Sequence, residues 1–354
     1  MSETNEAGAA TGHEVLVTTP SFGQHASEPW EVFEAAGVRA RTASAAHPLT
    51  ERQLIEEAEG VKALVVGLDP VTAAVLHAAP GLTVVAKHGV GTDNIDLAAA
   101  AAQGVRVVNA PGSNTTAVAD MTMALLLAAV RRIVPAHASV TAGRWDRFFG
   151  PELAGRTLGI VGFGRIGQAV ARRARGFDMD LIAYDPHLPA AVFAEQGVPA
   201  VTLDELIAAA DVITLHLPMP SGGPLLGRAE LAAMKPGSCV INTARGGLVD
   251  EDALAELLHS GHLAAAGIDV FATEPPAGNP LLTAPNAVLT PHCAAFTQQA
   301  NAAMGSTVAA DVVRVLRGRN RCTPWCERAM AHPVAACGKA PEPERERTRE
   351  NERS

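Results

Sequence analysis

The sequence predicts an α/β protein built from two doubly wound parallel sheets, and three observations support this prediction. The chain has 354 residues, which is more than one domain usually holds and enough for two. It contains 32 glycines and only 4% aromatic residues, which suits helices packed closely on a parallel sheet better than a β-sandwich. Short apolar runs alternate with helical patterns twice along the chain, as expected for two βα domains.

The first domain is predicted from residues 13–108. Three short apolar runs in it read as parallel strands: HEVLVTT, VKALVVG and LTVVAKHG. The helical patterns between them end at Gly37 and Gly60, which suit the residue after a helix C-terminus. A long helical pattern late in the chain, AAFTQQANAAMGSTVAADVVRVLRG, is expected to return to this domain. We therefore predict a discontinuous first domain of residues 13–108 and 296–319.

The second domain is predicted from residues 109–295. It begins with an apolar helix over 115–134, whose apolar residues on nearly all sides indicate burial against another domain or subunit. Six predicted strands follow: TLGIVGFGRIG, DLIAYDP, DVITLHLP, SCVINTARGG, LAAAGIDVF and NAVLTPH. They predict a second complete parallel sheet, with interdomain hinges at 108–112 and 293–297.

Charge and composition disfavour several classes of partner. The net charge of −9 gives no basic surface for nucleic acid, and no cluster of lysines and arginines suggests membrane binding. No apolar run approaches the ~18 residues of a spanning helix, so a cytoplasmic location is expected. The polar, mixed-charge residues 320–354 are predicted to be disordered.

The cysteines do not predict a disulfide framework or a metal site. There are five of them, an odd number, and they are scattered along the chain. Three lie in the C-terminal tail with one nearby histidine but without a CxxC pair: Cys322, Cys326, Cys337 and His332. Zinc sites usually show closer ligand spacing, so no metal is predicted.

The segment VGFGRIG, residues 161–167, predicts a phosphate-binding turn between a strand and a helix. Gly162 permits the tight turn, Gly164 lets the backbone approach a pyrophosphate, and Gly167 lets helix and strand touch. The next predicted strand ends at Asp185, where a ribose-binding carboxylate is expected. A carboxylate there would repel a 2′-phosphate, so the sequence predicts NAD rather than NADP.

Three further polar side chains follow predicted strands and are candidates for catalysis. Arg245 precedes two glycines and could hold a carboxylate with its planar guanidinium. Glu274 lies in DVFATEPP and could orient a base. His292 ends the last strand, in VLTPHCAAF, and histidine is well suited to move a proton near neutral pH. Taken singly, such residues are more often surface or capping residues than catalysts.

Their order along the chain resembles that of the D-isomer-specific 2-hydroxyacid dehydrogenases, which include 3-phosphoglycerate dehydrogenase, glyoxylate and hydroxypyruvate reductase, and formate dehydrogenase. The resemblance covers about residues 13–320 and depends on four motifs: VGFGRIG, MKPGSCVINTARGGLVDEDAL, AGIDVFATEPP and TPHCAAF. It implies a flavodoxin-like substrate domain, a Rossmann domain that prefers NADH to NADPH, and hydride transfer to or from C2 of a small 2-keto or 2-hydroxy acid.

The resemblance also implies residue roles. Arg245 would hold the substrate carboxylate, His292 would be the general acid and base, and Glu274 would hydrogen-bond His292 and raise its proton affinity. The cofactor-binding positions would be Gly162, Gly164, Arg165, Ile166, Gly167, Asp185, Pro218, Thr243, Ala244 and Asp269. Of these, Asp269 would bind the nicotinamide carboxamide, and Pro218 would form the adenine-side wall.

The resemblance places the substrate pocket in the first domain. Backbone amides at Val90 and Gly91 would hold the substrate carboxylate, while Lys87 and Ser21 could meet a polar or anionic C3 group. Gly67 departs from typical 3-phosphoglycerate dehydrogenases, which carry a phosphate-binding arginine there, and no regulatory domain follows residue 320. Candidate substrates are therefore 3-phosphohydroxypyruvate, hydroxypyruvate, glyoxylate and phosphonopyruvate. Lys87 could instead be a solvated strand-end charge.

Other interpretations remain open. Formate or phosphite could be the donor, although Glu274 stands where formate dehydrogenases carry glutamine, and NAD(H)-sensing corepressors of this family bind without turnover. Helix 115–134 and the loop with Trp145 resemble the family's dimer-forming element, which predicts a homodimer. Three residues have plain structural interpretations: His216 as a packed strand end, Asp120 in helix or hinge contacts, and Cys293 as a small apolar filler. For His216, a contact with the cofactor is the equal alternative.

Overall fold

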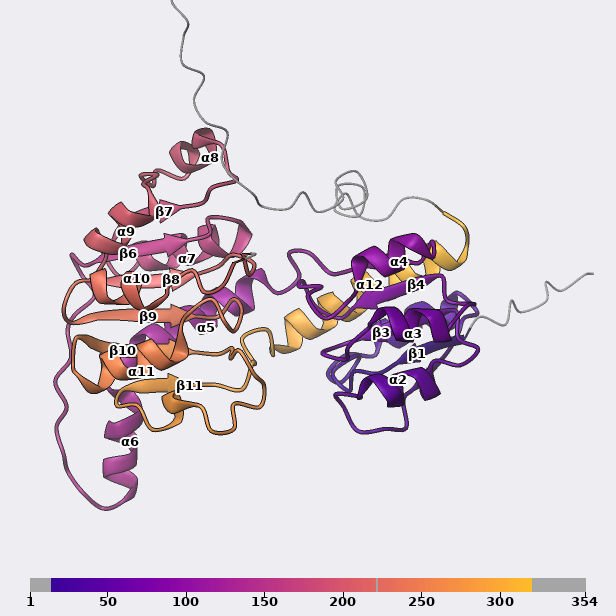
Figure 1. Ribbon diagram of the computed structural model, residues 1–354, viewed down its shortest axis with the longest axis horizontal. Helices are drawn as coiled ribbons and strands as arrows, with labels where there is room; N and C mark the ends of the chain where they lie inside the picture. The colour runs from indigo at the N-terminus through magenta and orange to yellow at the C-terminus, as the bar shows by residue number, and fades with distance from the viewer. Residues whose placement is uncertain (1–13, 221, 320–354) are drawn as a thin grey trace, which may run out of the picture.

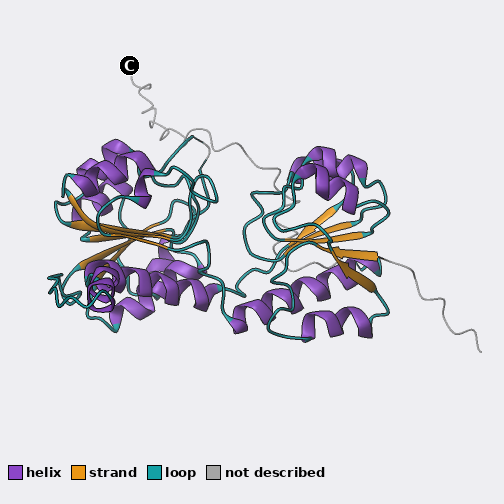
Figure 2. Ribbon diagram, turned by 90° about the horizontal axis from the view of Figure 1, so that it is seen from below, coloured by secondary structure: helices purple, strands orange, loops and turns teal. Residues whose placement is uncertain are grey.

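The computed structural model describes residues 14–220 and 222–319, which form two α/β bodies side by side (Figure 1). Each has a parallel sheet with helices on both faces, as Figure 2 shows. The predicted fold class is therefore confirmed. The tail prediction for residues 320–354, with its cysteines and His332, lies outside the described residues.

The first sheet has the strand order β2-β1-β3-β4-β5. Its strands are β1 (Glu14–Val17), β2 (Arg39–Thr42), β3 (Ala63–Val66), β4 (Val84–Lys87) and β5 (Arg106–Val108). Its helices are α1 (Glu28–Ala35), α2 (Glu51–Glu57), α3 (Ala73–Ala78), α4 (Leu97–Ala102) and α12 (Gln298–Leu316). Apolar residues of α1 and α12 cover one face of the sheet, and those of α2 to α4 cover the other. The late helix α12 thus packs on the first sheet, although the exact domain division stays a prediction.

The second sheet has the strand order β11-β10-β9-β8-β6-β7. Its strands are β6 (Thr157–Val161), β7 (Asp180–Tyr184), β8 (Val212–Leu215), β9 (Ser238–Asn242), β10 (Leu263–Ile268) and β11 (Ala287–Leu289), one for each predicted strand. Its helical elements are α5 (Thr115–Val130), α6 (Ile133–Thr141), α7 (Arg165–Arg175), α8 (Ala190–Glu195), α9 (Leu203–Ala209), α10 (Arg228–Ala233), α11 (Glu251–His259) and η1 (Pro280–Leu282). Helices α5 and α7 share one apolar core with the sheet, and α9 to α11 share the other.

The apolar helix predicted over 115–134 ends four residues early. Helix α5 stops at Val130, and Arg132 adopts a left-handed conformation with φ of 56°. The chain thereby changes direction into α6, which projects from the second domain in Figure 1. Two consecutive arginines, Arg131 and Arg132, follow the apolar run. Neither side chain is buried, so the buried part of the helix ends before them. Among the described residues, no helix is both long and apolar enough to cross a membrane.

Candidate active site

The glycine-rich turn follows β6, which lies between β7 and β8 in the second sheet. The chain adds β7 on one side of β6 and then crosses to add β8 on the other side, which is where such sheets bind ligands. Gly162 has φ of 91°, and a Cβ there would lie 2.6 Å from the backbone carbon of His216. A Cβ at Gly167 would lie 2.2 Å from the Gly162 carbonyl oxygen, so helix and strand touch there. At Gly164, the N-cap of α7, a Cβ would meet nothing within 4 Å, which leaves the backbone open to a ligand. These features fit a dinucleotide pyrophosphate.

The Asp185 carboxylate lies beside this turn. Its Oδ2 accepts a hydrogen bond from the Phe163 amide at 2.9 Å, and its Oδ1 accepts from the His187 amide at 3.0 Å. Phe163 is itself fully buried and stacks on Phe193, so the turn is anchored to the core. A half-buried carboxylate has spare acceptor positions for ribose hydroxyls. The position of Asp185 therefore fits the adenosine side of NAD.

The other predicted cofactor positions lie around the same strand ends. Arg165 is exposed and Ile166 is half-buried in the first turn of α7, while Pro218 is exposed after β8. Thr243 is buried, and its hydroxyl lies 2.9 Å from the hydroxyl of Thr122 on α5. Their contacts with NAD stay predictions.

Arg245 is held in place by the backbone around it. The Asn242 side chain donates to the Arg245 carbonyl at 2.8 Å and accepts from the Ala244 amide at 3.0 Å, which closes the turn after β9. A Cβ at Gly246 would lie 1.8 Å from the Phe271 carbonyl oxygen, so this glycine lets the turn pack on the segment that leads to Glu274. The guanidinium reaches the other domain, where Nε donates to Asp93 Oδ2 at 2.7 Å.

His292 and Glu274 form a direct pair. His292 Nδ1 lies 2.8 Å from Glu274 Oε2, and Glu274 Oε1 accepts from the Phe271 amide at 3.1 Å. Burial favours the neutral acid at Glu274, but the hydrogen bonds from His292 and Phe271 outweigh it, so the pKa of Glu274 lies below its usual value. An ionised Glu274 accepts the proton on Nδ1, which leaves Nε2 as the nitrogen available to a substrate.

The backbone around His292 is fixed by Asp269, which is fully buried. The Asp269 carboxylate accepts hydrogen bonds from the Thr290 hydroxyl at 2.6 Å and from the amides of Cys293 and Ala294, both at 2.9 Å. The Asp269 carbonyl accepts from the His292 amide at 2.8 Å. His292 itself has φ of 50°, a left-handed conformation that few non-glycine residues adopt without such support. The contact of Asp269 with nicotinamide stays a prediction. The sequence did not reveal that the Asp269 carboxylate anchors the loop around His292.

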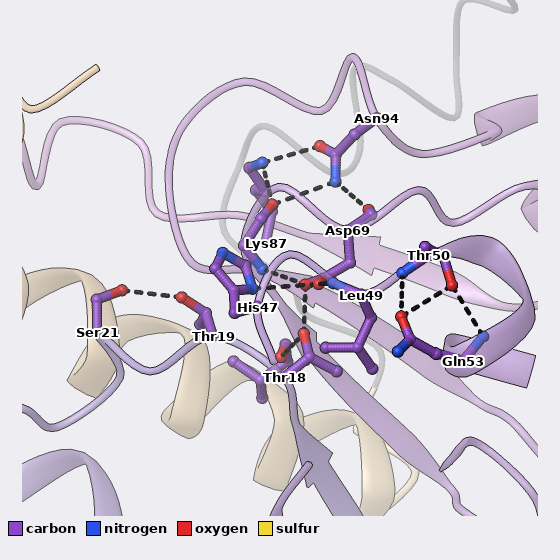
Figure 3. Close-up of polar contacts among 12 residues, drawn as sticks. Thr18, Thr19, Ser21, His47, Leu49, Thr50, Gln53, Asp69, Lys87 and Asn94 are labelled. Atoms are coloured by element: carbon purple, nitrogen blue, oxygen red, sulfur yellow. Dashed lines mark hydrogen bonds and ion pairs between the residues drawn. The ribbon is translucent and has the colours of Figure 1, made fainter. Parts of the chain in front are cut away.

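Two of the predicted substrate residues, Lys87 and Ser21, lie at and beyond strand ends of the first sheet (Figure 3). Lys87 is only 7% exposed, and its ammonium donates to the Gly67 carbonyl and to Asn94 Oδ1. Burial, followed by the charge of Arg245, lowers the pKa of Lys87 to about 8, against the opposing effect of Asp93 and Asp69. Lys87 is thus not a freely solvated strand-end charge.

The loop that follows Lys87 meets Arg245. A Cβ at Gly91 would lie 1.5 Å from Arg245 Nη2, so the guanidinium lies directly against this glycine. Val90 is half-buried, and its carbonyl accepts from the Asn109 side chain at 2.6 Å. Ser21 lies in the turn that follows β1, with its hydroxyl 2.9 Å from that of Thr19.

A buried carboxylate that the sequence did not single out organises this region. Asp69 is fully buried and accepts from the Thr18 hydroxyl and from the Leu49 amide at 2.7 Å, and His47 Nδ1 lies 3.1 Å from it (Figure 3). Burial favours neutral Asp69, but His47 and these donors lower its pKa to about 2. A Cβ at Gly67 would lie 2.8 Å from His47 Cε1, so the loop before α2 fills the space beside Gly67. The sequence signal was limited to an aspartate two residues after the predicted strand VKALVVG.

The three plain structural interpretations agree with the contacts. His216 Nε2 lies 2.9 Å from the Thr214 hydroxyl, and burial lowers the pKa of His216 to about 3. Asp120 pairs with Arg173 at 2.6 Å, which joins α5 to α7. Burial and the nearby Asp269 raise the pKa of the Cys293 thiol, which makes Cys293 a poor nucleophile.

Comparison with known proteins agrees with this arrangement. Residues 123–294 match the family model described as D-isomer specific 2-hydroxyacid dehydrogenase, NAD binding domain. D-3-phosphoglycerate dehydrogenase of Methanocaldococcus jannaschii is 47% identical over 275 residues, which are 76% of this chain and 52% of that protein. The enzyme of the same name from Mycobacterium leprae is 49% identical over 251 residues, 70% of this chain and 48% of that protein. The chain thus spans about half the length of these relatives.

Solved structures match over nearly their whole length. The TT0316 protein of Thermus thermophilus is 39% identical with a TM-score of 0.77, and the match covers 86% of this chain and 97% of that one. A glyoxylate reductase from Paecilomyes thermophila is 30% identical with a TM-score of 0.78, covering 87% and 97%. Motifs, strand order and these matches agree, and the chain belongs to the D-isomer-specific 2-hydroxyacid dehydrogenase family.

Proposed function

We propose that this chain is an NAD-dependent oxidoreductase that transfers a hydride between the nicotinamide and C2 of a small 2-hydroxy or 2-keto acid. The observation that carries the proposal is the 2.8 Å contact between His292 Nδ1 and Glu274, which leaves the opposite ring nitrogen for a substrate oxygen. The match of residues 123–294 to an NAD-binding domain and the open backbone at Gly164 support NAD as the cofactor.

The residues divide the chemistry between them. Bound NAD supplies the hydride donor or acceptor. Arg245 would hold the substrate carboxylate and polarise the 2-keto oxygen, since its guanidinium lies against Gly91. His292 would give the keto oxygen a proton during reduction and take it back during oxidation, while Glu274 stabilises the charged imidazole. Closure of the two domains would exclude water from this reaction.

The substrate is proposed to carry a polar or anionic C3 group, as 3-phosphohydroxypyruvate, hydroxypyruvate and phosphonopyruvate do. Lys87 supports this proposal, because its ammonium is fixed at the strand ends near Arg245 and adds positive charge there. The two relatives compared above bear the name D-3-phosphoglycerate dehydrogenase, which agrees with an anionic substrate.

Oxidation of NADH by purified protein, followed at 340 nm, tests the function against a panel of 2-keto acids. The panel comprises glyoxylate, pyruvate, hydroxypyruvate, 3-phosphohydroxypyruvate, phosphonopyruvate and 2-ketobutyrate. Turnover of one acid supports the proposal, and the KM of an acid with an anionic C3 group should rise above pH 8 as Lys87 loses its proton. If NADH binds but no acid reacts, the dehydrogenase proposal fails, and formate, phosphite and corepressor-like binding become the alternatives.

The cofactor preference is expected to depend on Asp185. Replacing it with serine removes the charge that would repel a 2′-phosphate. The ratio of kcat/KM with NADPH to kcat/KM with NADH should therefore rise by about tenfold or more. The matched control is Asp180→Ser, at the exposed start of the same strand, which should leave the preference unchanged. An unaltered preference in the Asp185 variant would remove this carboxylate from the cofactor site.

A homodimer is also proposed, with its contact on α6 and the following loop. Most of α5 packs on the second sheet and α7 of its own chain, whereas large apolar side chains further along are exposed, including Trp145 at 77% and Phe149 at 93%. Patches of this kind usually mark an interface. Light scattering at micromolar protein should give a dimer, and the double variant Trp145→Ser and Phe149→Ser should give a monomer. Phe177→Ser, exposed elsewhere, is the control; a monomeric wild-type protein would refute the proposal.

A further inference from the structure

The ion pair between Arg245 and Asp93 joins two loops that lie 152 residues apart in the sequence. Arg245 Nε donates to Asp93 Oδ2 at 2.7 Å, and Arg245 Nη1 donates to the Ala244 carbonyl at 2.6 Å. The planar guanidinium is therefore held from two sides, once by each domain. Its Nη2 lies against Gly91, within the loop proposed to receive the substrate carboxylate.

The pair is too exposed to matter much for folding. The Arg245 side chain is 32% exposed and that of Asp93 is 58% exposed, and ion pairs of this kind contribute little to stability. Orientation is a better explanation for it. Arginine carries five N–H donors in one plane, so fixing two edges of that plane decides where the remaining donors point.

The charge of Asp93 also acts on a second cation, Lys87. The pKa of Lys87, lowered first by burial and then by the positive charge of Arg245, is raised by the negative charge of Asp93. Arg245 and Lys87 would otherwise repel each other across the substrate site. Asp93 pairs with Arg245 and, together with Asp69, offsets the charge of Lys87. It lies beside the proposed position of the substrate carboxylate rather than in its place, because Nη2 is turned toward Gly91.

We propose that Asp93 is a positioning residue: its carboxylate holds the Arg245 guanidinium against the Gly91 loop, so that the remaining N–H groups face a single substrate carboxylate. The inference rests on the proposed function, because it assumes that Arg245 binds the substrate. It gives an exposed loop aspartate a role in substrate affinity that depends on Arg245.

Binding of oxamate, an unreactive carboxylate similar to a 2-keto acid, gives a readout that needs no turnover. Calorimetry on the NADH-loaded protein should show about tenfold weaker oxamate binding for Asp93→Ala, and a smaller loss for Asp93→Asn, which keeps an acceptor oxygen. NADH affinity should not change. Asp96→Asn is the matched control, because it removes the same charge from the same loop while asparagine still caps α4.

A double-mutant cycle separates positioning from a general effect on the loop. Arg245→Lys keeps a positive charge but has no Nε–H for Asp93, so Asp93→Ala should lose little further kcat/KM in that background. An equal loss in both backgrounds would overturn the proposal, as would unchanged or tighter oxamate binding by Asp93→Ala. If wild-type protein binds NADH but neither binds oxamate nor reduces any keto acid, the proposed function fails first and this inference fails with it.

Discussion

Replacing His292 with asparagine is expected to lower kcat by about 100- to 10,000-fold, which is the usual contribution of general acid and base catalysis. Asparagine retains a polar side chain of similar reach but cannot transfer a proton near neutral pH. Because His292 Nδ1 contacts Glu274, Nε2 is the nitrogen left for the substrate oxygen, and the loss of activity should fall on the chemical step. NADH affinity, measured by protein fluorescence, should stay close to that of the wild type.

Two comparisons make this result specific. His77→Asn changes an exposed histidine on α3 and should have wild-type kcat. Glu274→Gln should retain more activity than His292→Asn, because it removes only the charge that stabilises the imidazolium. Full turnover by His292→Asn on the acid that the wild type reduces would exclude this histidine as the proton donor.

The second sheet was predictable chiefly because its central strands β8 and β9 are buried on both faces. β8 (VITL) and β9 (SCVIN) have no exposed residue, so their sequences are mainly apolar and do not alternate with solvent-facing polar residues. In the first sheet, β2 was missed, because this edge strand has the sequence RART and none of its four residues is buried. β5 was missed because it has only three residues, two of them half-buried.

The candidate site shows a similar division. Arg245, Glu274 and His292 each follow a strand, and the carboxyl ends of parallel strands meet at one edge, so their convergence followed from the pattern. The residues that orient these three side chains could not be predicted from the sequence pattern. Asp93 meets Arg245 across two domains, and a loop conformation with no periodic signal decides that contact. Asp69 accepts hydrogen bonds from Thr18 and Leu49, which precede it by 51 and 20 residues and belong to no motif that contains it.

Asp269→Ala should be the most destabilising of the proposed substitutions, and it tests how the catalytic loop is held. The change leaves the Thr290 hydroxyl and two backbone amides without their acceptor in a buried place, and each such loss typically costs about 1–3 kcal/mol. We expect the free energy of unfolding to fall by about 3 kcal/mol or more, with a clear drop in the thermal midpoint of the second domain by calorimetry.

Asp269→Asn distinguishes the anchoring role from a role in cofactor binding alone. Asparagine can keep one oxygen for Thr290 and Cys293 but turns an NH₂ group toward the Ala294 amide, so its stability should lie between those of the wild type and Asp269→Ala. A carboxylate that served only the nicotinamide would lower NADH affinity in both variants and leave the midpoint unchanged. If the thermal midpoint and kcat both fall in the Asp269 variants, the left-handed backbone at His292 is maintained by Asp269. The proton-transfer residue would then depend for its position on a buried carboxylate in the preceding strand end.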